Sequence, residues 1–237
     1  MQEEKMIINN SNGRIYTEVK EMGYLLEMEI PDRLLDEIEN SIYGTTKYEF
    51  VIYTADRKNV VARINGRLFN EKKYDYPYAM VTHADLMGQE EYDNMVVLVN
   101  SREFILNRSN EFYFNSWCGY IYNCYVYEEY RNNGIGKFLL NNLHRIVYEY
   151  LGMKLRCVVV SVVPFLPVYD ENGEESWKRD DYEEGISTEE ICQVLLNCGF
   201  DYTEEYYKYL CEVQNGGHVE YDEDDEEYIE GPDFIIY

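Results

Sequence analysis

The segment from residue 117 to residue 163 most strongly limits the folds open to this chain. It begins with an aromatic and β-branched run, WCGYIYNCYVY (117–127), which predicts a strand. Residues 136–151 then place apolar side chains at helical spacing and predict an amphipathic helix. The run LRCVVVSVV (155–163) has an unbroken β-branched character that is typical of a strand covered on both faces. This order predicts a sheet with helices packed against it.

The sequence on either side adds antiparallel pairs at both ends of the chain. Residues 48–69 read as a hairpin, because two β-forming arms flank a polar turn. Further expectations are a helix over 31–43 with Pro31 in its first turn, a strand or buried helical piece over 95–99, a loop or insertion over 166–186, a helix opened by a capping box of Ser187 and Glu190, and strands over 206–213 and 233–237. Together they predict a mixed α/β fold: a single domain over residues 1–237, whose mixed, mostly antiparallel central sheet is flanked by helices and carries insertions.

The charge of the chain is strongly negative and unevenly spread. The net charge is −25, and residues 165–237 hold 23 of the 46 acidic residues and only 3 of the 21 basic ones. Such a chain repels nucleic-acid phosphates, so a DNA or RNA partner is not expected. The acidic part is either a solubilising surface or a surface that attracts a cationic substrate.

The cysteines and histidines give no metal-binding pattern. Six cysteines form no C-x-x-C pair and the three histidines lie far apart, so no metal is expected. Cys118 and Cys124 are an even number apart in the predicted strand, and their side chains could face the same side. The N-terminus lacks the apolar core of a signal peptide, and no apolar run approaches the length of about 18 residues that spans a membrane. We therefore expect reduced thiols, no membrane partner and a cytoplasmic location.

Between the predicted strand and helix lies the turn RNNGIGK (131–137). The first turn of a helix leaves backbone N–H groups without intrahelical partners, and the helix dipole places partial positive charge there. Glycines let a ligand approach this backbone closely, and phosphate is the usual occupant of such a site. Arg131 and Lys137 would add positive charge. The turn could also be an ordinary strand-to-helix connection that needs glycine only for its geometry.

Two nucleotide-binding patterns do not fit this turn. A Walker loop needs G-x-x-x-x-G-K-[ST], but Arg131 stands at the first glycine and Phe138 at the hydroxyl position. A dinucleotide fingerprint needs a small residue at its third position, which Leu139 occupies here. A phosphate bound at this turn is therefore expected to belong to another kind of ligand.

The sequence RNNGIG (131–136) resembles the pyrophosphate motif Q/R-x-x-G-x-G/A of the GNAT superfamily, whose members transfer acyl groups from acyl-CoA to amines. The preceding VYEEYR (126–131) is similar to the family's V-x-P-E-Y-R, with Glu128 in place of proline, and LLNCGF (195–200) resembles its helix ending in LGF. The resemblance covers roughly residues 48–237. It leaves residues 1–47 as an N-terminal extension and helix, 70–115 as an unmatched stretch and 166–186 as an acidic insertion.

The resemblance implies a binding site for acetyl-CoA as co-substrate, without a metal. The implied binding residues are Cys124, Tyr125, Val126, Arg131, Asn132, Asn133, Gly134, Ile135, Gly136 and Lys137. It implies that the N–H groups of 132–137 cradle the pyrophosphate and that the edge of strand Cys124–Val126 pairs with the pantetheine arm. A bulge would splay this strand from 155–163 and make room for the thioester. There the amine would attack directly in a ternary complex, while a backbone N–H near Val126 polarises the carbonyl oxygen.

The resemblance leaves the catalytic acid and base unassigned. Leu195 stands where many family members have a tyrosine that protonates the leaving thiolate, and Pro164 interrupts the position of the family's asparagine. The candidates are Tyr122, Tyr125 and Tyr169, each of which could equally be a packing residue. A CoA thiolate could also leave without a dedicated acid.

The acceptor is implied to lie near the closing hairpin, which carries Asp222–Glu227. With the acidic insertion, this favours a cationic small molecule, such as a polyamine or an aminoglycoside, or a peptide amine on lysine or at an N-terminus. The alternative is a catalytically weak or inactive GNAT-like module that binds CoA or a protein partner through its acidic surface. Exposed tyrosines could support a homodimer.

Overall fold

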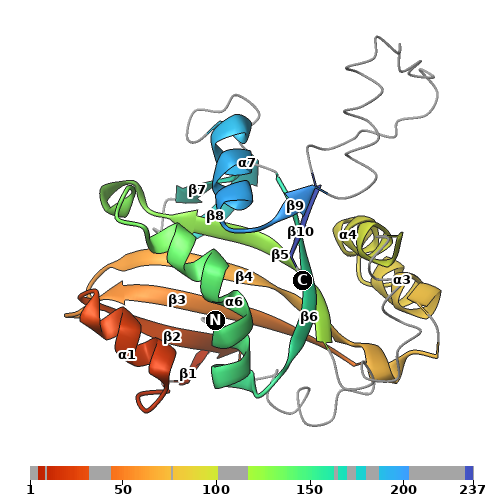
Figure 1. Ribbon diagram of the computed structural model, residues 1–237, viewed down its shortest axis with the longest axis horizontal. Coiled ribbons are helices and arrows are strands. Elements are labelled where there is room, and N and C mark those ends of the chain that lie inside the picture. Colours follow the sequence, from red (N-terminus) through yellow and green to blue (C-terminus); the bar gives the residue numbers. More distant parts are fainter. Residues whose placement is uncertain are drawn as a thin grey trace.

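One large sheet organises the molecule (Figure 1). The computed structural model describes residues 5–8, 10–31, 44–75, 77–100, 117–162, 165–169, 175–179, 187–202 and 233–236. Within these ranges, eight strands form a sheet in the order β1-β2-β3-β4-β5-β6-β10-β9, and β7 and β8 form a separate hairpin. β5 and β6 are parallel, whereas the other neighbouring strands of this described sheet are antiparallel. The predicted mixed, mostly antiparallel sheet flanked by helices is confirmed.

The strands of both sheets are interspersed with helices along the described chain. The strands are β1 (Lys5–Ile8), β2 (Tyr24–Pro31), β3 (Thr45–Thr54), β4 (Val60–Asn70), β5 (Trp117–Val126), β6 (Leu155–Ser161), β7 (Phe165–Tyr169), β8 (Glu175–Arg179), β9 (Asp201–Tyr202) and β10 (Asp233–Ile236). The helices are α1 (Arg14–Glu21), α3 (Pro77–Asp85), α4 (Gln89–Asn100), α6 (Ile135–Leu151) and α7 (Thr188–Asn197), with short 3-10 turns η1 (Glu71–Lys73) and η3 (Glu128–Tyr130).

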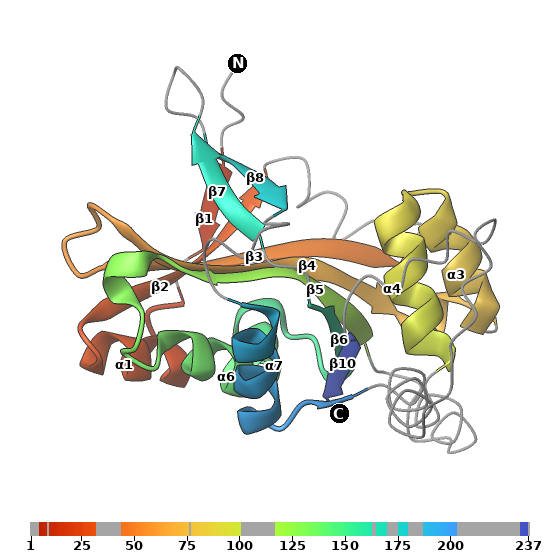
Figure 2. The same cartoon turned by 90° about the horizontal axis from the view of Figure 1, so that it is seen from above.

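Helices α1, α6 and α7 cover one face of the sheet, and the β7–β8 hairpin lies on the other side (Figure 2). The larger core forms between these helices and the sheet. α6 contributes seven buried residues to it, Ile135, Leu139, Leu140, Leu143, Ile146, Val147 and Tyr150. The six residues from Leu139 to Tyr150 in this set are the apolar stripe that the helical spacing of residues 136–151 predicts, and Ile135 adds a seventh residue before that range. Burial of that stripe fixes α6 across the sheet.

Helices α3 and α4 cover the opposite face of the sheet with a second core. Met80, Met95 and Leu98 of these helices pack there against Cys157 and Val159 of β6. The alternate β6 residues Val158 and Val160 point into the larger core. β6 is therefore covered on both faces, which confirms the interpretation of its unbroken apolar run.

Several local predictions agree with the structure. The hairpin predicted over 48–69 is β3 and β4, and residues 233–236 form a strand that pairs with β6. The capping box is present: the Ser187 hydroxyl accepts from the Glu190 backbone N–H, and the Glu190 carboxylate accepts from the Ser187 N–H. Residues 95–99, which the sequence assigns to a strand or a buried helical piece, lie in α4.

Other predictions are wrong or fall outside the described residues. Of the two readings of residues 166–186, the loop is wrong, since β7 and β8 pair within them, whereas the insertion stays a prediction. Pro31, expected in the first turn of a helix, is the last residue of β2, and β1 and β2 of the N-terminal extension are part of the sheet. The pairing of Pro31 within the sheet thus outweighs the preference that proline has for the first turn of a helix. The rest of the predicted helix over 31–43, the strand over 206–213 and Asp222–Glu227 lie outside the described residues.

Candidate active site

The centre of the candidate site is the point where β5 leaves β6. The two strands pair from Trp117 to Ile121, where the last pair joins Ile121 to Val160. β5 then continues for five residues, 122–126, without further pairing to β6 in the described register. Exposure changes at the same place, because residues 118–121 are buried and 122–126 are only half-buried. β6 ends at Ser161, one residue beyond this last pair, so the final residues of β5 have no β6 partner in the described register. The opening between the two strands that the family resemblance implies stays a prediction.

A β-bulge marks the same position on the other edge of β5. Asn65 pairs with Asn123 and Gly66 pairs with Ile121, so Tyr122 has no counterpart on β4. A Cβ on Gly66 would collide with the Tyr120 carbonyl oxygen and approach the Tyr48 hydroxyl to 2.6 Å. Glycine is therefore needed for the close contact of β4 with β5 at the bulge.

The bulge reverses the alternation of β5 side chains between the two faces of the sheet. Cys118 and Tyr120 belong to the core under α3 and α4, and Tyr122 packs against it. Cys124 and Val126 pack instead against the core under α6. The expectation that Cys118 and Cys124 share a face is thus wrong, because one extra residue between them shifts the alternation of the strand.

The end of β5 leads directly into the glycine turn. After η3, Asn132 and Gly134 adopt left-handed backbone conformations, with φ of 64° and 75°. Gly134 is the N-cap of α6, and the first intrahelical bond runs from the Phe138 N–H to the Gly134 carbonyl at 2.9 Å. The N–H groups of residues 135–137 come before this first bond in the chain, so they have no acceptor within the helix. In the described structure no N-cap side chain bonds to them, and the first turn contains no acidic residue.

The surroundings of this turn suit an anion. Asn132, Asn133, Gly134 and Lys137 are exposed, whereas Ile135 is buried and offers only its backbone. A Cβ on Gly136 would meet Val126 Cγ2 at 3.3 Å, so the glycine keeps the junction between the β5 edge and α6 open. The predicted binding residues from 124 to 137 thus occupy one continuous strand edge and helix N-terminus. A pyrophosphate fits the donors present here.

Arg131 is bound within the turn itself. Its Nε donates to the Val126 carbonyl at 3.0 Å, and a terminal nitrogen donates to the Tyr125 hydroxyl at 3.0 Å. The guanidinium carbon also lies 5.4 Å from the centre of the Tyr125 ring. Burial raises the pKa of Tyr125, although the nearby Arg131 opposes this. Arg131 therefore ties the end of β5 to the turn, while its charge stays close to the helix N-terminus.

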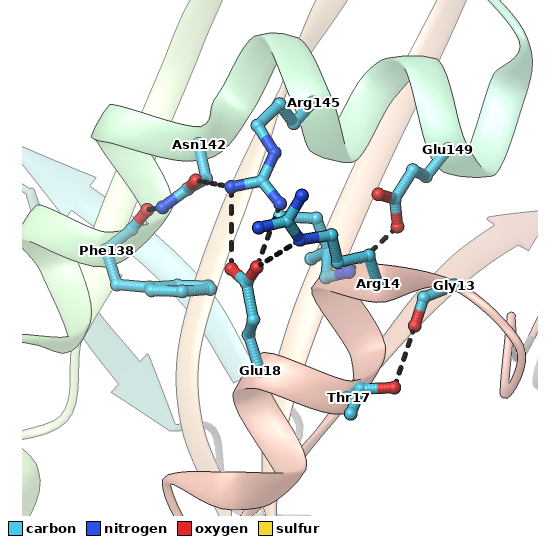
Figure 3. A network of polar contacts seen from close by, with 9 residues as sticks. Gly13, Arg14, Thr17, Glu18, Phe138, Asn142, Arg145 and Glu149 are labelled. Carbon is cyan, nitrogen blue, oxygen red and sulfur yellow. Dashed lines mark hydrogen bonds and ion pairs between the residues drawn. The ribbon is translucent and has the colours of Figure 1, made fainter.

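A network of polar contacts anchors α6 to α1 on the side away from the sheet (Figure 3). Arg145 of α6 donates to Glu18 of α1 at 3.0 Å. Glu149 accepts from the Ile15 backbone N–H at 2.9 Å, which places a carboxylate at the N-terminus of α1. Together with the buried stripe, these contacts hold α6 and thus its first turn in a fixed position.

The three candidate tyrosines have different surroundings. Tyr169 on β7 is 55% exposed and lies near enough to raise the pKa of Tyr125. Tyr122 is half-buried at the bulge, and its hydroxyl donates to the Glu91 carboxylate at 2.6 Å. Leu195 is 2% exposed in the core, so the family's tyrosine position here is a packing residue.

Sequence reasoning missed two partners of Tyr122. Arg67 of β4 donates from Nε to the Tyr122 hydroxyl at 3.3 Å and approaches Glu91 at 3.5 Å. Glu91 comes from α4, 31 residues before Tyr122 in the chain. No local motif signals this group, because its members come from three elements that meet only in the fold.

One comparison with known proteins, a family profile, matches the segment that contains the candidate site. Residues 96–173 match the sequence profile of the acetyltransferase (GNAT) family, and this range contains β5, the glycine turn, α6 and β6. The match confirms the resemblance noted in the sequence. The solved apo form of a mutant agmatine N-acetyltransferase aligns with a TM-score of 0.32 at 13% identity, covering 64% of this chain and 74% of that one. That likeness is remote, and no curated protein sequence matches significantly.

The described residues lack two further features, a metal-binding cluster and a membrane-spanning helix. No group of three or more His, Cys, Asp or Glu side chains is arranged to hold a metal ion within the described part of the chain. Among its described helices, none combines the length and apolar character needed to cross a membrane.

Proposed function

We propose that this chain, whose residues 96–173 carry the acetyltransferase (GNAT) family profile, is an N-acetyltransferase that moves an acetyl group from acetyl-CoA to a primary amine. The profile match supports acetyl transfer in general. The finer statement, that acetyl-CoA is the donor and an amine the acceptor, is supported by the family resemblance and by the form of the site.

The observation that carries this proposal is the continuity between the unpaired edge of β5 and the N-terminus of α6. Beyond Ile121, β5 presents an edge unpaired with β6 in the described register, and that edge ends at the uncapped N-terminus of α6. A ligand with an extended amide-bearing arm and a pyrophosphate needs a strand edge for the arm that continues into an anion site for the pyrophosphate. We assign the pyrophosphate to the N–H groups of 132–137 and the arm to the edge of Cys124–Val126.

In the proposed reaction the amine attacks the thioester carbonyl directly in a ternary complex. A C–N bond forms, the C–S bond breaks, and CoA leaves as its thiolate while the amine loses a proton. A backbone N–H of β5 near Val126 stabilises the negative charge on the carbonyl oxygen. The thiolate takes a proton from water, so the packed Leu195 is compatible with turnover.

We further propose that the acceptor is cationic. The net charge of −25, with its concentration in residues 165–237, supports attraction of an amine that carries positive charge. A polyamine, an aminoglycoside and a lysine-bearing peptide represent the three forms of such an acceptor.

Thiol release from acetyl-CoA in the presence of each acceptor tests the function. We expect release with at least one cationic amine, together with an acetylated product in mass spectrometry. Acetyl-CoA binding without release across the panel would favour the alternative, a GNAT-like module that binds CoA. Failure to bind acetyl-CoA would reject the enzyme and the CoA-binding module together.

A further inference from the structure

We propose that the acceptor is an extended diamine, whose distal ammonium group binds the side-chain amides of Asn123 and Asn65 while its other nitrogen attacks the thioester near Val126. This inference rests on the proposed acetyl transfer and names the class of amine that the same site takes. Of the three forms of cationic acceptor, it selects the polyamine.

The face of β5 over which an acceptor can approach is the first argument. In the proposed function the arm of acetyl-CoA takes the edge of the strand, so the acceptor has to lie over one of its two faces. Cys124 and Val126 pack against the core under α6, which closes the first face. Asn123 and Tyr125 alternate with them, point to the second face and are half-buried. An acceptor that reaches Val126 over this second face, here called the acceptor face, lies over Tyr125 and Asn123.

Two amide side chains on the acceptor face are the second argument. Asn123 pairs with Asn65 of β4 in the ladder, beside the bulge. Asn65 follows Ile64, which packs in the core under α6, so both amides point to the acceptor face. Both are half-buried, and neither amide group has a hydrogen-bond partner among the described residues. Their two carbonyl oxygens can accept from an ammonium group, which carries three donors.

The charge beside the amides favours a cation. Glu49 of β3 is the ladder partner of Asn65. The carboxylates of Glu49 and Glu29 lie 2.9 and 3.8 Å from the same guanidinium, that of Arg63. Two carboxylates that share one guanidinium leave one net negative charge among these three described groups. An ammonium group at the amides is therefore preferred over a carboxylate.

The reacting end of the acceptor meets the opposite charge. Arg131 donates to the Val126 carbonyl and to the Tyr125 hydroxyl, both at 3.0 Å, so its guanidinium lies at the end of β5 where the amine attacks. A positive charge nearby lowers the pKa of an amine, because it disfavours the ammonium form. A diamine is thus oriented with its protonated end at the amides and its neutral, nucleophilic end at Val126.

The spacing of the two ends sets the length of the acceptor. Asn123 and Val126 are three residues apart on β5, which corresponds to roughly 10 Å of extended strand. An extended chain of single bonds advances about 1.2 Å per bond, so two nitrogens at this separation are joined by about eight bonds. The diamine 1,7-diaminoheptane has this length, whereas 1,3-diaminopropane is too short.

Steady-state kinetics with acetyl-CoA and three amines test the inference. The amines are 1,7-diaminoheptane, 1,3-diaminopropane and heptylamine, which keeps the seven-carbon chain but lacks the second nitrogen. For the wild type we expect KM to be lowest for 1,7-diaminoheptane. The KM of the other two should be roughly 10-fold to 100-fold higher, which is the usual effect of losing hydrogen bonds to a charged group.

Variants of Asn123 locate the effect on the acceptor face. Asn123→Leu should raise KM for 1,7-diaminoheptane by about 10-fold, because one amide is lost. Asn123→Asp should lower the same KM, because a carboxylate then faces the ammonium group. In both variants kcat, the KM for heptylamine and the affinity for acetyl-CoA in calorimetry should stay unchanged. Opposite effects of the two substitutions cannot come from misfolding.

A matched control lies on the other side of the sheet. Asn141→Leu makes the same substitution at an exposed position of α6 and should keep the wild-type KM for both seven-carbon amines. Thermal unfolding of each variant identifies a loss of rate that comes from a loss of structure.

The outcomes separate this inference from the function on which it rests. Wild-type turnover with equal KM for 1,7-diaminoheptane and heptylamine would overturn the inference and leave the acetyltransferase intact. Asn123 variants that change the KM of both amines equally would also overturn it, as would turnover confined to an aminoglycoside or a lysine-bearing peptide. No wild-type turnover with any amine would reject the proposed function, and this inference with it.

Discussion

At the scale of single residues, the left-handed backbone of Gly134 limits which side chains the turn accepts. Gly134 has a φ of 75°, and a Cβ added there would meet no atom within 4 Å. The cost of replacing it is therefore set by its backbone conformation. Left-handed backbone costs an L-residue about 1–2 kcal/mol, whereas asparagine tolerates it better than alanine does.

Gly134→Ala should accordingly lower the free energy of unfolding by about 1 kcal/mol, and Gly134→Asn by less. We also expect weaker acetyl-CoA binding by the alanine variant, because the N–H groups of the turn lose their fixed directions. Urea denaturation and calorimetry measure the two effects. Equal stability of the two variants would mean that the left-handed conformation is not enforced in solution.

The glycine turn can be predicted from sequence, whereas the hydrogen-bonded group around Tyr122 cannot. The residues of RNNGIGK are consecutive, so their sequence alone predicts a helix N-terminus that suits an anion. Glu91 and Arg67 reach Tyr122 only through the packing of α4 and β4 against β5. Such contacts depend on tertiary structure and leave no short-range pattern.

At the scale of elements, the bulge in β5 determines where the strand opens. Its existence depends on the pairing of β4 with β5, so the alternation of β5 residues alone predicts the wrong face for Cys124. The end of the β5–β6 pairing likewise depends on both strands. The sequence thus predicts the elements around the site correctly, while their register has to come from the fold.

Gly66→Ala tests the bulge. The added methyl group would collide with the Tyr120 carbonyl oxygen, which cannot move without its strand. We expect a loss of about 2 kcal/mol or more in the free energy of unfolding. Gly136→Ala is the matched control, since its Cβ meets only Val126 Cγ2 at 3.3 Å, and it should cost less than about 1 kcal/mol. Similar losses in both variants would argue against the tight contact at Gly66.

The contact between α1 and α6 should depend on pH through Glu18. The hydrogen bond from Arg145 is the largest cause that lowers the pKa of Glu18 below its ordinary value of 4.5. A lowered pKa stabilises the folded state above the ordinary value, and this contribution is lost as the pH falls through the folded-state pKa. Both side chains are partly exposed, so the pair contributes at most about 1 kcal/mol.

Arg145→Met should therefore reduce stability at pH 7, and the difference from wild type should narrow toward pH 3. Urea denaturation at a series of pH values gives this difference directly. Lys20→Met removes an exposed charge of α1 and serves as control. A difference that stays constant with pH would show that Arg145 acts through packing and not through Glu18.

At the scale of the whole molecule, the uneven charge should act on the acceptor. A net charge of −25 attracts a cationic amine from a distance, and added salt screens this attraction. We expect the KM for the cationic acceptor to rise severalfold as the salt concentration increases, with kcat nearly unchanged. Kinetics with a less charged amine provide the comparison. A KM that does not depend on salt would argue against recognition by charge.

The central claim is that the first turn of α6 binds the pyrophosphate of acetyl-CoA. The sharpest variant is Gly136→Glu, which places a side chain and a negative charge where Val126 meets the turn. Asn141→Glu adds the same charge at an exposed position further along α6 and leaves the turn intact. The two variants therefore separate a local effect from a change in net charge.

Calorimetric titration of acetyl-CoA into the wild type and these two variants is the most direct test. The account predicts binding of one acetyl-CoA per chain by the wild type and by Asn141→Glu, and no measurable binding by Gly136→Glu. Absence of binding by the wild type, or equal affinity in wild type and a folded Gly136→Glu, would contradict it.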